Sequence, residues 1–129
     1  MIKHLYAVTM VASVLSFGCA SSRSGDQMQA TTSPSSSRVT VPVELDDYVI
    51  RMPATIPPGD VTFAVKNVGD HSHNVRVRGQ NVDAALPKNL KGGESGTLEA
   101  HLEPGTYRVT CPVGPHAMMG MRTTLTVKK

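Results

Sequence analysis

The sequence of 129 residues predicts an all-β protein, an antiparallel β-sandwich or barrel, and three observations support this prediction. From Val39 onward, short runs alternate apolar and polar residues with a period of two, as in Val61-Thr-Phe-Ala-Val65. Turn-forming sequences such as Pro57-Pro-Gly-Asp60 and Pro104-Gly105 separate the runs. Only three aromatic residues follow residue 38, so the core must consist mainly of Val, Leu and Ile. Alternation between frequent turns is typical of half-buried strands in a sandwich.

Seven segments fit such strands, in the order 39–43, 47–51, 61–66, 73–78, 98–103, 107–111 and 121–127. The first two are rich in the β-branched and aromatic residues that favour strands. The next four place their apolar residues, together with His73 and Cys111, at every second position. In the last segment Met121, Leu125 and Val127 share one face. Residues 82–90 are expected to hold a turn of helix.

Residues 1–18 have the layout of an export signal peptide, with a positive charge at Lys3, an apolar stretch from Leu5 to Phe17 and a small residue at Gly18. The apolar stretch is too short to remain as a membrane-spanning helix. Its removal takes away Lys3 and lowers the formal charge from +3 to +2. The remaining basic residues are scattered, so a nucleic-acid partner is not expected.

Cys19 follows Gly18 in a segment that resembles the lipobox of bacterial lipoproteins, which implies lipidation of Cys19 and a place in the periplasm or cell envelope. Ser16 departs from the aliphatic residue usual three positions before the cysteine, and an ordinary secretory signal cut near Gly18 or Ala20 is the alternative. Residues 19–38 are expected to be a flexible tether, because nine of residues 21–37 are Ser or Thr and such a segment cannot bury enough surface to fold. The domain itself is expected over 39–129.

The strand phases bring four chemically related side chains to one end of the expected sandwich. His73 opens one strand, Cys111 ends another and Met121 opens the last, each on the apolar face of its strand. If the Cys111 strand runs antiparallel to the other two, all three side chains point inward at the same end, next to His116 in the intervening loop. Two imidazoles, one thiolate and a weak axial thioether form the ligand set of a blue-copper electron-transfer site. We therefore expect one copper ion, cycling between Cu(I) and Cu(II), at these four residues.

Two longer runs are similar to those of the cupredoxin family, which includes plastocyanin and azurin. The run Pro104–Met121 resembles its C-terminal signature, with Tyr, three residues, Cys, four residues, His, four residues and Met. The run Gly59–Asn74 resembles the segment that carries the first histidine ligand, followed by Asn. The resemblance covers residues 39–129 and implies a Greek-key fold of about seven to eight strands. It also implies that Asn74 supports the site by hydrogen bonds that join the two ligand-bearing loops.

One departure from the family pattern concerns the ligand loop. Related sequences often have Pro-Gly before the loop histidine, whereas this chain has Gly114-Pro115. A proline disfavours helical geometry in the residue before it, so Gly114 is expected to be extended. The path of the loop that carries His116 is therefore expected to differ from that of the family.

Other residues compete for the roles assigned above. His71 is two residues from His73 but is expected in a solvated loop, and Met118 and Met119 compete with Met121 for the axial position. Cys111 could instead be a buried structural thiol, although an unpaired thiol is a liability in an oxidising compartment. His101 alternates outward between two glutamates and is expected at the surface.

The resemblance implies a monomeric one-electron carrier that docks transiently with redox partner proteins near His116. The alternative is periplasmic copper binding, delivery or tolerance. An enzyme is not expected, because the sequence offers no nucleophile–base pair and no second metal site.

Overall fold

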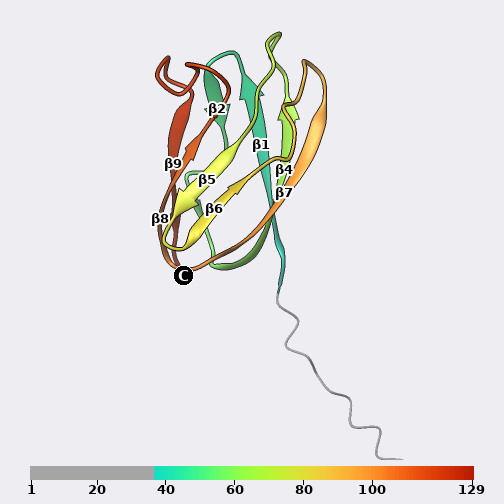
Figure 1. Ribbon diagram of the computed structural model, residues 1–129. Coiled ribbons are helices and arrows are strands. Elements are labelled where there is room, and N and C mark those ends of the chain that lie inside the picture. The colour runs from blue at the N-terminus through green and yellow to red at the C-terminus, as the bar shows by residue number, and fades with distance from the viewer. Residues whose placement is uncertain (1–36) are drawn as a thin grey trace, which may run out of the picture. The chain divides into compact units, whose positions relative to one another are not determined.

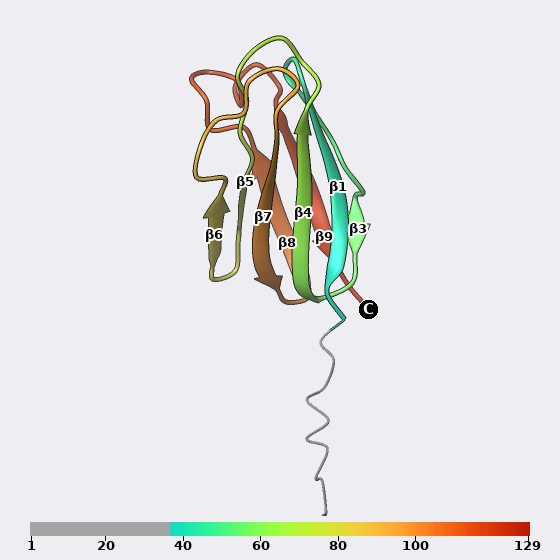
Figure 2. The ribbon, with the colours of Figure 1, turned by 90° about the vertical axis from the view of Figure 1, so that its right-hand side faces the viewer.

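The structure, a computed structural model, describes residues 37–129, which form two β-sheets packed face to face (Figure 1; Figure 2). The expected signal peptide and most of the expected tether lie outside these residues, as does Cys19. Within residues 37–129, nine strands follow one another in the order β1 (Val39–Asp46), β2 (Val49–Arg51), β3 (Thr55–Ile56), β4 (Gly59–Asn67), β5 (Arg76–Gly79), β6 (Val82–Ala85), β7 (Ser95–Leu102), β8 (Gly105–Thr110) and β9 (Arg122–Val127). The described residues include no helix long and apolar enough to cross a membrane.

The strand order confirms the all-β prediction and adds two parallel pairings. One sheet has the order β2-β1-β4-β7 and the other β3-β9-β8-β5-β6. β1 pairs with β4 in parallel, and β3 pairs with β9 in parallel, whereas all other pairs are antiparallel. After β1 and β2, the chain leaves the four-stranded sheet and forms β3 in the five-stranded sheet. It then returns to the four-stranded sheet as β4, which runs in the same direction as β1. The sheets are therefore mixed, and not purely antiparallel as the alternation alone suggested.

The core has the composition that the sequence predicts. Among the residues that the structure describes, sixteen of the twenty buried apolar residues are Val, Leu or Ile, and Phe63 and Tyr107 are the largest fully buried side chains. Fully burying one such aliphatic or aromatic side chain contributes roughly 1.5–3 kcal/mol. The Tyr107 hydroxyl donates to the carbonyl of Glu103 (3.0 Å) and accepts from its backbone N–H (3.1 Å), which fixes the turn before β8.

Two local predictions are wrong. Residues 82–85 form strand β6 in place of a helical turn, because a short turn at Gln80 and Asn81 brings them antiparallel to β5. Asp47 and Tyr48, expected in a strand, form the tight turn between β1 and β2, and Tyr48 has a φ of 62°. This turn lies at the end of the sandwich where β4 and β8 also end, so both of its residues reach the site described next.

Candidate metal centre

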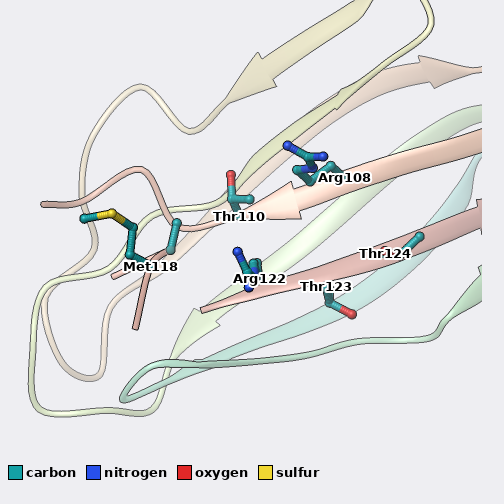
Figure 3. A pocket seen from close by; sticks show the side chains of 7 residues that line it. Arg108, Thr110, Met118, Arg122, Thr123 and Thr124 are labelled. Atoms are coloured by element: carbon teal, nitrogen blue, oxygen red, sulfur yellow. The ribbon is translucent and has the colours of Figure 1, made fainter. Parts of the chain in front are cut away.

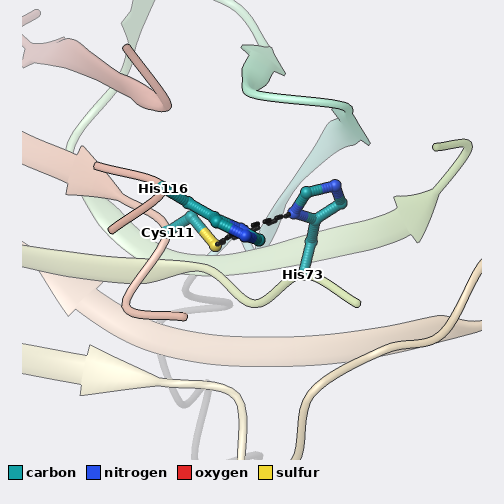
Figure 4. A group of neighbouring side chains, drawn as sticks. All are labelled: His73, Cys111 and His116. Atoms are coloured by element: carbon teal, nitrogen blue, oxygen red, sulfur yellow. Dashed lines mark hydrogen bonds between the residues drawn. The ribbon is translucent and has the colours of Figure 1, made fainter. Parts of the chain in front are cut away.

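Three side chains with metal-binding atoms meet at one end of the sandwich (Figure 4). His73 lies between β4 and β5, Cys111 follows the last residue of β8, and His116 lies in the loop between β8 and β9. β8 runs antiparallel to both β5 and β9, as the predicted convergence requires. His73 and Cys111 are fully buried, whereas His116 is half-buried. They are the only group of three or more such side chains within 37–129 whose donor atoms lie this close together.

The three donor atoms form a triangle that fits one metal ion. The two Nδ1 atoms are 3.2 Å apart, and the Cys111 sulfur lies 3.9 Å from that of His73 and 3.7 Å from that of His116. The point equidistant from the corners of a triangle with sides of 3.2, 3.7 and 3.9 Å lies about 2.1 Å from each corner, which matches metal–imidazole bonds of roughly 2.0–2.1 Å. One thiolate and two imidazoles in a trigonal arrangement suit copper. The residues present therefore fit the metal that the sequence predicts.

Met121 lies directly opposite Cys111 across the β8–β9 ladder. The ladder pairs Thr110 with Arg122, and the Cys111 N–H donates to the Met121 carbonyl at 3.0 Å, so Cys111 and Met121 form the next opposed pair. Opposed residues of an antiparallel pair project on the same face with Cβ atoms about 4.5–5.5 Å apart. Both side chains are fully buried. Met118 and Met119, the competing sulfurs, are 81% and 54% exposed.

A carboxylate that the sequence analysis missed orients His73. Asp47 Oδ1 lies 3.1 Å from His73 Nε2. Hydrogen bonds from His73 and from the backbone of His71 lower the pKa of Asp47 to about 2, so the carboxylate is ionised and can only accept. The His73 Nε2 must then carry the proton, which leaves the Nδ1 lone pair free for a metal. A carboxylate behind a ligating histidine fixes the tautomer and increases the basicity of the ring.

The turn between β1 and β2 also supplies an aromatic ring that covers the histidines. The ring of Tyr48 meets that of His116 edge-on, with centroids 5.1 Å apart, and that of His73 at 6.4 Å. Burial lowers the pKa of His116, and the neighbouring His73 lowers it further. Both effects favour the neutral imidazole, the form that binds metal.

The buried side chain of Asn67 holds the segment that carries His73. Its amide donates to the carbonyls of His71 and Leu90, both at 2.8 Å, and its oxygen accepts from the Gly69 N–H at 3.0 Å. His73 and Leu90 exchange two backbone hydrogen bonds, so the same clamp fixes the His73 backbone. The only sign of this role in the sequence is the run Asn-Val-Gly, which suits a turn.

Asn74 bonds to a different segment from the expected one. Its amide lies within hydrogen-bond distance of the carbonyls of Leu86 and Lys88 and of the side chain of Asn89, and its oxygen accepts from the Val75 N–H. These contacts fix residues 86–89 against the His73 segment. They do not extend to the loop of Cys111 and His116, which is held by its own backbone.

The ligand loop is closed by backbone hydrogen bonds at both ends. The Met121 N–H donates to the His116 carbonyl at 2.9 Å, and the His116 N–H donates to the Val113 carbonyl at 3.1 Å. Gly114 has a φ of +46°, so the expectation of an extended residue before Pro115 is wrong. A residue without Cβ adopts this left-handed geometry at little cost. The inverted Gly-Pro order is thus accommodated by a turn at Gly114.

The remaining candidates lie outside the triangle. The His71 side chain is 59% exposed, and its Nδ1 lies 3.1 Å from Asp47. His101 is exposed, as expected, and its ring lies 2.8 Å from Asp60 at the far end of β4.

The fold and site define a copper-binding protein of the cupredoxin class. The family model described as copper binding proteins of the plastocyanin/azurin family matches residues 50–128. The chain therefore belongs to this family, and its cofactor is a single type 1 copper ion. No curated protein matches the chain significantly.

Solved structures support the same fold. An auracyanin from Roseiflexus castenholzii is 21% identical, with a TM-score of 0.58, over 71% of this chain and 97% of that one. Auracyanin B is 23% identical, with a TM-score of 0.60, over 72% and 90% of the two chains. Rusticyanin from Thiobacillus ferrooxidans is 18% identical, with a TM-score of 0.57, over 70% and 77%. At these identities the similarity establishes the cupredoxin sandwich.

Proposed function

We propose that this protein is a one-electron carrier of a bacterial cell envelope, with His73, Cys111, His116 and Met121 as the copper ligands. The observation that carries the proposal is the donor triangle, whose dimensions fit a single metal ion. When bound, the ion supplies the Cu(I)/Cu(II) couple. A site held rigid by β-strands needs little rearrangement when the charge of the ion changes, which suits electron transfer.

The side chains of the site have separate roles in electron transfer and in support of the metal centre. Cys111 joins the site covalently to β8, and half-buried His116 offers a route to the surface through the loop that contains exposed Met118 and Met119. Asp47 and Tyr48 orient and shield the histidines. With all four positions filled by protein ligands, no site is left for a substrate, so we propose a carrier and not an enzyme.

Electrochemistry of the copper-loaded protein tests this function. We expect a reversible one-electron response that persists over many cycles, with copper retained throughout. An irreversible response, or loss of copper from the reduced protein, would refute the carrier function.

Copper handling is the second candidate, favoured by the exposure of Met118 and Met119, because thioethers bind Cu(I). Incubation of the Cu(I) protein with a Cu(I) chelator distinguishes the two functions. Rapid surrender of the ion, slowed in the variant Met118→Leu/Met119→Leu, would support handling. Retention supports the carrier.

We further propose that Cys19 is lipidated and anchors a monomeric domain near a membrane. The supporting features are the Gly18-Cys19 junction and the Ser/Thr-rich segment that follows. Mass spectrometry of the mature N-terminus tests it, because an unmodified terminus, or one that begins after Cys19, would instead indicate an ordinary secretory signal.

A further inference from the structure

The outer face of the five-stranded sheet carries four arginines in a regular grid, which we call the arginine face. It consists of Arg76 and Arg78 on β5, Arg108 on β8 and Arg122 on β9. The strand register places Arg78 opposite Arg108, and Arg76 and Arg122 on either side of Thr110. Because residues two apart on a strand share a face, all four side chains project to the same side, away from the core. Their neighbours Val77 and Val109 are fully buried, which confirms this phase.

Only two of these four arginines have an acidic partner within the described residues. Asp83 on β6 accepts from Arg76 at 2.6 and 2.7 Å and from Arg78 at 3.3 Å. No acidic side chain in residues 37–129 lies within ion-pair distance of Arg108 or Arg122. Four guanidinium groups and one carboxylate leave a formal local charge of +3. Arg108 and Arg122 are therefore available to bind carboxylates from outside the chain.

The other sheet differs in the charge of its outer face. Exposed or half-buried acidic side chains occur on β1, β4 and β7, namely Glu44, Asp46, Asp60 and Glu99. Lys66 and Arg51 provide basic side chains on the same sheet. The positive charge of the domain is thus concentrated on the five-stranded sheet, which contains the Cys111 strand.

The arginine face is continuous with the surface next to the metal centre. A shallow hollow of about 520 Å³ is lined by Arg108, Thr110 and Arg122 on the sheet and by Ala117 and Met118 of the ligand loop (Figure 3). Thr110 immediately precedes Cys111. A partner seated in this hollow would lie one residue from the Cys111 backbone and would touch the loop that carries His116.

We propose that the arginine face and Met118 form the docking surface for an acidic redox partner protein, an inference that rests on the proposed function. Arginine binds carboxylates through paired, charge-assisted hydrogen bonds, which would fix the orientation of the partner. A concentrated positive surface also increases the association rate with an anionic partner. An anionic membrane would be attracted by the same charges, but a bilayer on this face would also cover the loop through which the electron leaves.

The first test measures the oxidation of the Cu(I) protein by hexacyanoferrate(III), which accepts one electron, by stopped-flow at low ionic strength. Arg108→Glu/Arg122→Glu should slow this reaction about tenfold and should accelerate oxidation by the cationic tris(phenanthroline)cobalt(III). Lys128→Glu/Lys129→Glu is the matched control, because it changes the total charge equally at the opposite end of β9, and it should have a much smaller effect. Equal effects of the two double variants would refute a localised surface.

The second test locates the surface by NMR titration of the Cu(I) protein with poly-L-glutamate. We expect salt-sensitive shifts at Arg108, Thr110, Met118 and Arg122, and their loss in Arg108→Glu/Arg122→Glu. Shifts elsewhere would overturn the proposal. It would also be overturned if phosphatidylglycerol vesicles bound through the same arginines more tightly than poly-L-glutamate does. Electrochemistry of each variant separates the docking proposal from the carrier proposal. A normal copper couple without charge-dependent docking would refute only the role of the arginine face. Binding of poly-L-glutamate without a reversible copper couple would refute only the carrier function.

Discussion

Replacing Asn67 by leucine should destabilise the protein by about 3 kcal/mol, because the side chain makes three buried or partly buried hydrogen bonds worth about 1 kcal/mol each. Two of its partners keep another bond: the Leu90 carbonyl accepts from His73, and the Gly69 N–H reaches the Leu45 carbonyl at 3.3 Å. The His71 carbonyl loses its amide partner, but water can replace that partner because this segment is exposed. The free-energy cost of losing this hydrogen bond is therefore limited. For a domain of this size, about 3 kcal/mol corresponds to a fall in Tm of roughly 12–24 °C.

Urea unfolding of the metal-free protein, followed by tyrosine fluorescence and circular dichroism, measures this change. Asn81→Leu is the control, because Asn81 is exposed in the turn between β5 and β6, and its unfolding free energy should change by less than about 0.5 kcal/mol. The variant Asn67→Leu should also release copper faster, since Asn67 holds the His73 segment. A loss below about 1 kcal/mol would refute the assigned role of Asn67.

Three further predictions concern the site and the core. Met121→Leu should raise the reduction potential in a redox titration while copper is retained, because the axial thioether is replaced by hydrocarbon. Met118→Leu and Met119→Leu should leave the reduction potential nearly unchanged. A large shift in either of these two variants and none in Met121→Leu would assign the axial ligand to the loop. Asp47→Asn should raise the potential by on the order of tens of millivolts, because a negative charge near the metal stabilises Cu(II) more than Cu(I); an unchanged potential would mean that Asp47 has no electrostatic influence on the site. Tyr107→Phe should lower the unfolding free energy by about 1–3 kcal/mol through loss of both hydrogen bonds to Glu103, and an unchanged urea midpoint would contradict that contribution.

The sequence allowed prediction of the parts of the site that depend on local spacing. The residues from Cys111 to Met121 form one loop and its flanking strands, so their spacing and alternation largely determine which side chains point inward. His73 could be placed for the same reason, because its phase matches that of Val75 and Val77, both fully buried. The convergence of His73, Cys111 and His116 followed from strand directions that the structure confirms.

The supporting residues depend on contacts that alternation does not encode. Asp47 and Tyr48 lie far from the ligands in sequence and reach them only because a tight turn forms where a strand was expected. The residues of β6 have helix-compatible composition, but pairing with the free edge of β5 outweighs this weak preference. The parallel pairing of β1 with β4 likewise depends on the path of the intervening chain between the sheets.

The visible spectrum of the purified protein with one equivalent of Cu(II) tests the central claim most directly. A trigonal site of one thiolate and two imidazoles predicts intense Cu(II)–thiolate colour in the wild type and its complete loss in Cys111→Ala, whose fold should persist by circular dichroism. A folded wild-type protein that binds Cu(II) without developing this colour, or that fails to bind it, would contradict the assignment of a blue-copper centre to His73, Cys111, His116 and Met121.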